Sequence, residues 1–169
     1  MKKTACWSFE DPAEATAFLD DSFKEYLDTY TREDLFKMLH DVAEQGNPIM
    51  QQALGFCYVI GYGCEVNQKE AVTWWESAAE QNEYASQYCL GIYYYEGNCI
   101  PKNYRKAFYW FRKSAEQGCD NAQLMLGECY YLGHGVKKNY ETAVEWYIEA
   151  AKNGNAEAKA ILSQILMLN

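Results

Sequence analysis

The sequence LGFCYVIGYGC at residues 54–64 recurs as LGIYYYEGNCI at residues 90–100 and as LGECYYLGHGV at residues 126–136. The Leu-Gly pairs that open these three segments are 36 residues apart. The same step relates Tyr58, Tyr94 and Tyr130; Gly61, Gly97 and Gly133; Asn67, Asn103 and Asn139; Ala71, Ala107 and Ala143; and Trp74, Trp110 and Trp146. A fixed period of this length indicates an array of supersecondary repeats.

Each repeat has the pattern of two antiparallel helices. Leu54, Tyr58 and Gly61 fall on one face of a first helix, because residues four and seven positions apart align at the helical period. Asn67 stands where a second helix would begin and suits its N-cap, and we expect Trp74 on that helix to face the core. The second helices are expected to end at residues that tolerate a left-handed backbone, namely Gly46, Asn82, Gly118 and Gly154.

The repeats predict three parts within one continuous, all-α domain of about nine helices. Residues 1–46 are expected to form diverged, acidic N-terminal capping helices, residues 47–154 three repeats, and residues 155–169 a C-terminal capping helix. In the first part, Asp11-Pro12 would open a helix that runs to about Tyr30. Thr31-Arg32-Glu33-Asp34 resembles a capping box that precedes another helix over residues 32–45.

The motif resembles the Sel-1-like repeat family over residues 39–169. Leu-Gly is followed by Tyr, then by Gly133-His134-Gly135-Val136, then by Ala-x-x-Trp and a closing Ala-Ala-x-x-Gly. The resemblance implies an α/α superhelical solenoid related to tetratricopeptide repeats, and an adaptor or scaffold role in protein complexes. Cys99 in place of the second Gly and Asn82 in place of a closing Gly depart from the motif. A disulfide-rich branch of the family pairs cysteines in every repeat, and we do not carry those bridges over, because the cysteines here share no register.

The candidate binding surface is the side of the first helices opposite the repeat core. Counting 100° per residue from Leu54 places nine residues there: Gln52, Phe56 and Val59; Tyr88, Ile92 and Tyr95; Leu124, Glu128 and Tyr131. Seven of these nine are apolar or aromatic, whereas the same count on the second helices gives mostly charged residues. Two interpretations stay open. The first helices pack on both neighbours, or they line a concave groove that binds a partner.

Composition excludes several other functions. A net charge of −9 and a pI near 4.7 argue against nucleic-acid binding. No apolar run is long enough to span a membrane, and no long apolar segment follows Met1-Lys2-Lys3, so we expect a cytoplasmic protein. Catalytic motifs are missing and the two histidines, His40 and His134, lie in different repeats, with His134 expected to face solvent. We therefore expect no enzyme, no cofactor and no metal site.

The cysteines are expected to be reduced packing residues. They are odd in number and contain no CxxC pair: Cys6, Cys57, Cys64, Cys89, Cys99, Cys119 and Cys129.

The function expected from these observations is a non-catalytic interaction module that binds a protein or peptide through the concave first-helix surface. The alternative is a cytoplasmic immunity or inhibitor protein that neutralises a toxin enzyme. Residues 1–46 carry 11 acidic and 5 basic side chains, which would suit a basic partner or merely solvate the cap. The apolar stretch at residues 161–168 either docks on the preceding helices or makes a dimer contact, so the protein is expected to be a monomer or a weak homodimer.

Overall fold

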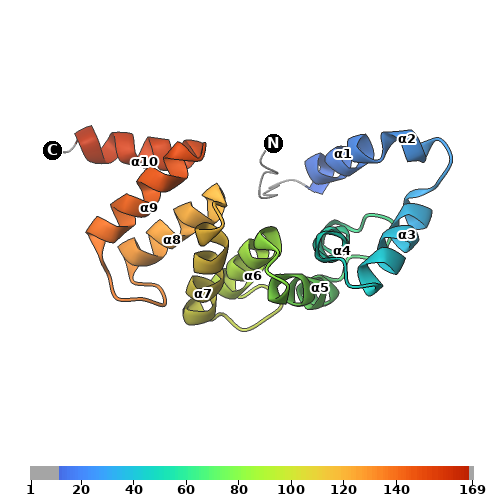
Figure 1. The fold of residues 1–169 in the computed structure, drawn as a ribbon, viewed down its shortest axis with the longest axis horizontal. Helices are drawn as coiled ribbons and strands as arrows, with labels where there is room; N and C mark the ends of the chain where they lie inside the picture. The colour runs from blue at the N-terminus through green and yellow to red at the C-terminus, as the bar shows by residue number, and fades with distance from the viewer. Residues whose placement is uncertain (1–11, 168–169) are drawn as a thin grey trace. The chain divides into compact units, whose positions relative to one another are not determined.

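The computed structural model of the protein describes residues 12–167, which form ten α-helices and no strand (Figure 1). The helices are α1 (Pro12–Ser22), α2 (Lys24–Leu27), α3 (Arg32–Glu44), α4 (Pro48–Ile60), α5 (Gln68–Glu80), α6 (Tyr84–Glu96), α7 (Tyr104–Glu116), α8 (Asp120–Leu132), α9 (Tyr140–Lys152) and α10 (Ala156–Met167). The all-α prediction is confirmed. The helix expected before Thr31 is divided into α1 and α2, and its expected cap at Asp11 lies outside the described residues.

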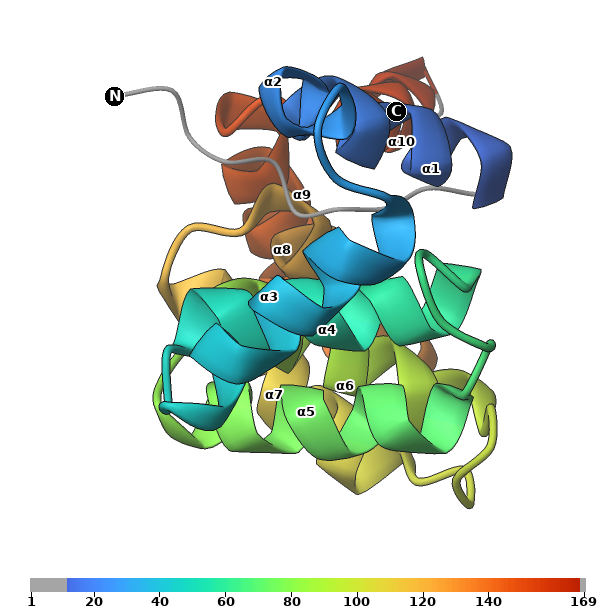
Figure 2. The ribbon, with the colours of Figure 1, turned by 90° about the vertical axis from the view of Figure 1, so that its right-hand side faces the viewer.

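Two compact units make up this part of the chain. The N-terminal unit ends at Ser86 and the C-terminal unit begins at Gln87, so the division falls inside α6. In the N-terminal unit, α3, α4 and α5 pack as successive layers (Figure 2). In the C-terminal unit, α7 packs on α8, α8 on α9, and α9 on α10. The boundaries at residues 46 and 154 that the repeats suggest stay predictions.

The helix ends follow the repeat motif. The side chains of Asn67, Asn103 and Asn139 each accept a hydrogen bond from a backbone N–H in the first turn of the following helix. Thr31 forms the expected capping box with Asp34 at the start of α3. Asn82 adopts a left-handed backbone, with φ of 68°, where the other repeats have Gly. These local predictions are confirmed, because capping depends on residues that are near in sequence.

The Leu-Gly motif packs against an aromatic ring in the next helix of its own unit. A Cβ atom added to Gly55 would lie 2.5 Å from Trp75 Nε1, and one added to Gly127 would lie 2.6 Å from the ring of Tyr147. Gly91 faces Phe111 in the same way. Only glycine lets the ring approach the helix backbone so closely. The Leu-Gly glycines are therefore packing residues.

The aromatic positions predicted to face the core are one residue out of register. Trp74, Trp110 and Trp146 are only half-buried. The residues that follow them, Trp75, Phe111 and Tyr147, are the buried rings. The prediction followed the identity of Trp across the repeats, whereas packing needs only an aromatic ring of some kind at the buried position.

A set of buried glutamines recurs with the same period. Gln81 Nε2 donates to Gln51 Oε1 at 2.9 Å, and Gln117 Nε2 donates to Gln87 Oε1 at 2.8 Å. In the third repeat, Asn153 Nδ2 donates to Gln123 Oε1 at 2.8 Å. These hydrogen bonds join the first helix of each repeat to the end of its second helix.

One cysteine departs from the expectation that all thiols are reduced. Cys119, at the N-cap of α8, is disulfide-bonded. Cys57, Cys89 and Cys129 are buried thiols, as expected, while Cys99 is exposed. Disulfide pairing cannot be deduced from cysteine spacing alone, which is why the prediction is wrong at Cys119.

Candidate protein-binding site

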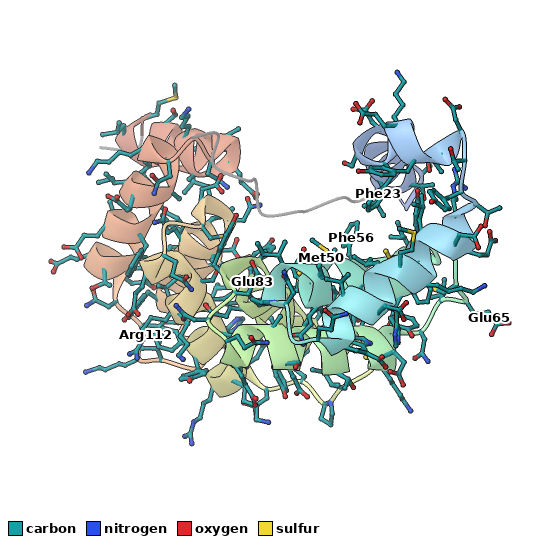
Figure 3. The ribbon with its side chains drawn as sticks, turned by 45° about the vertical axis from the view of Figure 1, so that its right-hand side comes forward. Phe23, Met50, Phe56, Glu65, Glu83 and Arg112 are labelled. Carbon is teal, nitrogen blue, oxygen red and sulfur yellow. The ribbon has the colours of Figure 1, made fainter. Side chains whose placement is uncertain are left out.

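The three candidate residues in the N-terminal unit are not open to a partner. Gln52 and Phe56 are buried, and Val59 is half-buried. α1 also packs on α4 in this unit. In Figure 3, the Phe56 side chain lies on the side of α4 where Phe23, the residue that follows α1, is also drawn. The face of α4 that was predicted to line a groove is therefore largely inaccessible in this unit.

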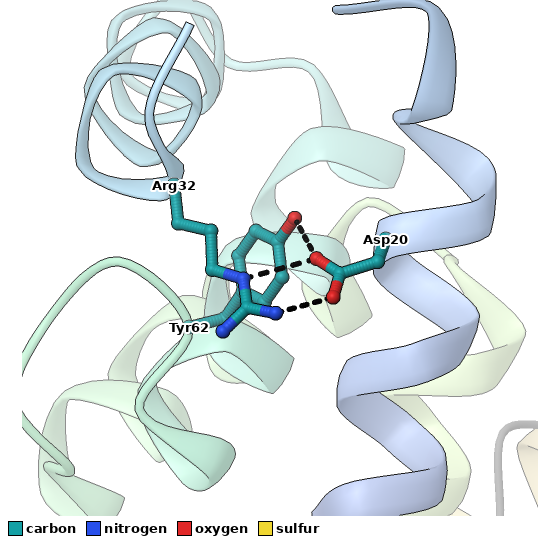
Figure 4. A network of polar contacts seen from close by, with 3 residues as sticks. All are labelled: Asp20, Arg32 and Tyr62. Carbon is teal, nitrogen blue, oxygen red and sulfur yellow. Dashed lines mark hydrogen bonds and ion pairs between the residues drawn. The ribbon is translucent and has the colours of Figure 1, made fainter. Parts of the chain in front are cut away.

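A polar network fixes α1 in this position (Figure 4). Arg32 Nε donates to Asp20 Oδ1 at 3.0 Å, its NH2 group donates to Asp20 Oδ2, and Tyr62 OH donates to Asp20 Oδ1 at 3.0 Å. The hydrogen bond from Arg32 lowers the pKa of Asp20, while burial and the bond to Asp20 raise the pKa of Tyr62 to about 12. The network joins α1 to the start of α3 and to the turn after α4.

The six candidates in the C-terminal unit differ in exposure. Leu124 is buried, and Tyr88, Ile92, Tyr95 and Glu128 are half-buried. Tyr131 is the candidate with an open side chain, at 50% exposure. Most of the set is therefore at least half-buried, and its role in binding a partner stays a prediction.

Tyr95 takes part in a packed aromatic group, together with a histidine that was expected to face solvent. His134 is half-buried, its ring stacks on that of Tyr104 at 4.0 Å, and its Nδ1 lies 3.0 Å from Tyr95 OH. The turn around His134 folds back on the start of α7, which explains why a residue flanked by two glycines is not fully solvated. Tyr95 thus has a structural role.

Glu128 and Tyr131 come together in a groove formed by α8, α9 and α10. This C-terminal groove has a volume of about 370 Å³ and is lined by Glu128, Tyr131, Leu132, Tyr147, Ile161, Gln164 and Ile165. Most of these side chains are apolar or aromatic. The groove is therefore an amphipathic surface with one carboxylate in it.

The apolar end of the chain supplies one wall of this groove. Ile161 and Leu162 pack against the core formed by Tyr147 and its neighbours, so α10 docks on the preceding helices. Leu166 and Met167 remain 77% and 86% exposed. The composition of this stretch is unusually apolar, but nothing in the sequence predicts that it faces α8. Its last apolar residue, Leu168, lies outside the described residues.

The electrostatics of the C-terminal groove come from Glu128. Its pKa is raised, chiefly because burial penalises the charged form and secondarily because Glu157 is near. A half-buried carboxylate in apolar surroundings favours a cation or a strong hydrogen-bond donor as its partner. Tyr131 adds an exposed ring, with its centroid 5.3 Å from that of Tyr140.

The described residues hold one group with metal-ligand chemistry. The donor atoms of His40, Asp41 and Glu44 all lie within 4.8 Å of one another, and two of these three side chains are exposed. Such a cluster on one helix turn is common on protein surfaces, and nothing else near it points to an ion. Among the described helices, none has the length and apolar character needed to cross a membrane.

Comparisons with known proteins agree with the repeat pattern. A model of the Sel1 repeat matches residues 48–83, 85–119 and 120–155. Among solved structures, a Sel1 repeat protein from Oxalobacter formigenes is 37% identical, with a TM-score of 0.71 over 76% of this chain and 96% of that one. No curated protein is a significant match.

Two further solved structures share the fold. A protective antigen of uropathogenic Escherichia coli, which displays an SLR fold, is 33% identical, with a TM-score of 0.75 over 80% of this chain and 29% of that one. The chain thus spans less than a third of the length of that antigen. Cysteine rich protein B of Helicobacter pylori is 24% identical, with a TM-score of 0.63 over 78% of this chain and 97% of that one, which supports the solenoid fold alone.

Proposed function

Because the chain belongs to the Sel1 repeat family, whose members are generally protein-interaction modules, we propose that it is a non-catalytic module that binds a protein partner in the C-terminal groove. The groove carries the proposal, because it is where candidate residues from the repeats, Glu128 and Tyr131, line an accessible apolar surface. Exposed Tyr beside apolar walls is typical of binding hot spots.

The partner that fits this groove is a short amphipathic segment. A volume of about 370 Å³ accommodates a few side chains and not a whole domain. Its apolar residues would pack on Ile161 and Ile165, while a Lys or Arg would face Glu128. A cation next to a half-buried carboxylate also contributes specificity, since a partner without it would leave Glu128 desolvated and unpaired.

The test is a comparison of two tyrosines with the same exposure. Tyr131 lines the C-terminal groove, and Tyr26, on α2, is also 50% exposed but lies in the other unit. Partners captured from a lysate by the wild-type chain are identified by mass spectrometry, and the affinity of the purified partner is measured by calorimetry. We expect Tyr131→Ala to weaken binding about tenfold or more and Tyr26→Ala to leave it unchanged. Full affinity in the folded Tyr131→Ala variant would show that the partner binds elsewhere.

A second substitution tests the role of the carboxylate. Glu128→Gln keeps the shape of the side chain and removes its charge, so we expect weaker binding and a smaller dependence on salt concentration. An unchanged salt dependence would exclude a basic group opposite Glu128.

The identity of the captured partner separates the adaptor from the inhibitor alternative. A single stoichiometric enzyme that loses activity on binding would support the immunity or inhibitor function. Several partners that share one amphipathic motif would support the adaptor. A second copy of this chain in the groove, detected by sedimentation equilibrium and lost on Leu166→Glu, would support the weak homodimer instead.

The cytoplasmic location also remains a proposal. It rested on the lack of a long apolar run and of an apolar segment after Met1-Lys2-Lys3, whereas disulfides such as that of Cys119 persist mainly in oxidising compartments. Cell fractionation with an antibody to the native chain tests it: the location holds if the protein stays with cytoplasmic markers.

A further inference from the structure

The C-terminal unit has a second pocket, separate from the C-terminal groove. It lies between the start of α7 and the turn that follows α8, and its volume is about 600 Å³. We call it the turn pocket. Its lining residues are Lys102, Asn103, Tyr104, Arg105, Gly133, Gly135, Val136 and Lys137.

The turn pocket is basic in a chain that is strongly acidic. Lys102, Arg105 and Lys137 line it, and no carboxylate does. Within the described part of the chain, none of these three cations forms an ion pair. Lys102 Nζ instead lies 5.6 Å from the centroid of the Tyr104 ring. All three side chains are exposed, so their charges are open to a ligand from solution.

The repeat itself does not require these charges. Two repeats earlier, in the N-terminal unit, the positions of Lys102, Arg105 and Lys137 are occupied by Tyr30, Glu33 and Glu65. Glu65 projects from the turn after α4 in Figure 3.

The backbone of the two turns is nevertheless the same. A Cβ atom on Gly63 would collide with the carbonyl of Arg32, as one on Gly135 would with the carbonyl of Tyr104. The same close contact therefore forms with acidic side chains around it, and the three cations have no role in holding the turn.

We propose that the turn pocket binds the carboxylates of an acidic peptide segment. Residues 102–113 contain five basic side chains and no acidic one, so a positive strip continues along α7 from the pocket as far as Arg112, which pairs with Glu116. Several carboxylates in one extended segment match this strip better than a single small anion. A nucleic acid fits less well, because a chain with a net charge of −9 would repel the rest of the polyanion. The site does not depend on the C-terminal groove or on its partner.

The experiment uses fluorescein-labelled hexaglutamate and the full chain at low ionic strength, with binding followed by fluorescence anisotropy. The test variant combines Arg105→Glu with Lys137→Glu, which introduces the residue type already present at Glu33 and Glu65. The control combines Lys24→Glu with Lys159→Glu, which changes the net charge equally but leaves the pocket intact. Far-UV circular dichroism verifies folding, and Arg105→Gln provides a milder variant.

We expect the pocket variant to bind hexaglutamate at least about tenfold more weakly and the control variant to change by less than about twofold. Arg105→Gln should give an intermediate loss. In the wild-type chain, the amide resonances of Gly133 and Gly135 should shift on titration. No binding by the wild-type chain, or an equal loss in the control, would overturn the proposal. Tighter binding of an oligothymidylate than of hexaglutamate at the same glycines would overturn it in favour of a nucleic acid.

Discussion

Two neighbouring glutamines of α4 should respond in opposite directions to the same substitution. Gln51 and Gln52 are both 5% exposed. Gln51 uses both ends of its amide, since it donates to the carbonyl of Ala43 at 3.1 Å and accepts from Gln81 at 2.9 Å. The Nε2 atom of Gln52 is buried and has no hydrogen-bond partner in the described structure. One amide is therefore fully paired and the other is not.

Methionine is the appropriate replacement, because it has a similar volume and no hydrogen-bonding amide. Gln51→Met removes two hydrogen bonds, each of which contributes about 1 kcal/mol, so unfolding should become easier by about 1–2 kcal/mol. The loss should be near 1 kcal/mol if the exposed side chain of Gln81 forms a hydrogen bond with water in place of the one to Gln51. Gln52→Met removes a buried donor that gains nothing from the fold, so the free energy of unfolding should rise by about 1 kcal/mol.

The assay is urea denaturation of the three proteins at pH 7, followed by circular dichroism and by tryptophan fluorescence. For a chain of this length, 1 kcal/mol corresponds to roughly 2–4 °C in Tm, so thermal melts provide an independent measurement. Equal m-values would show that the denatured states are alike. If both variants lose stability by the same amount, the argument from hydrogen-bond pairing is wrong and packing alone decides the result.

Two further predictions concern one glycine and one carboxylate. Gly127→Ala should destabilise the protein by about 1–3 kcal/mol, because the added Cβ would collide with a buried ring. This effect should outweigh the usual preference of about 1 kcal/mol for Ala over Gly in a helix interior. A more stable variant in thermal melts would contradict this packing. The folded pKa of Asp20 is lowered, so its contribution is present above the unfolded pKa of about 3.9 and is lost as pH falls through the lower folded value. Asp20→Asn should therefore cost about 0.5–1 kcal/mol at pH 7 and progressively less as the pH falls and the carboxyl is protonated. Denaturation at a series of pH values measures this difference, and an offset that is constant with pH would refute it.

The sequence allowed the helices and their ends to be predicted because both depend on nearby residues. Asn103 caps α7 and Asn82 adopts a left-handed backbone in the predicted places. The core register was predicted less well, because Trp recurs at the half-buried position of Trp74, whereas the buried position of Trp75 varies in residue type. The sequence does contain a signal for the buried register, because Trp75, Phe111 and Tyr147 are all aromatic and are 36 residues apart.

The proposed C-terminal groove contains only part of the surface predicted from the sequence. Glu128 and Tyr131 line the C-terminal groove, but Phe56 is buried in a unit where α1 packs on α4. That packing depends on Asp20 meeting Arg32 and Tyr62, contacts between residues that no repeat relates. Periodicity describes what the repeats share, and a capping helix is by definition outside the period.

The buried glutamines have a consequence for how each unit unfolds. Gln51 joins the end of α3 to the end of α5 through its own helix, and Gln123 joins α7 to α9 in the same manner. Each of these two amides spans three consecutive helices, so it belongs to two helix pairs at once. In a linear array of repeats, such a shared amide strengthens the interaction between neighbouring helix pairs relative to the intrinsic stability of each pair. Partial unfolding of a single helix pair inside a unit should therefore be a rare species, and hydrogen exchange should release the three linked helices together.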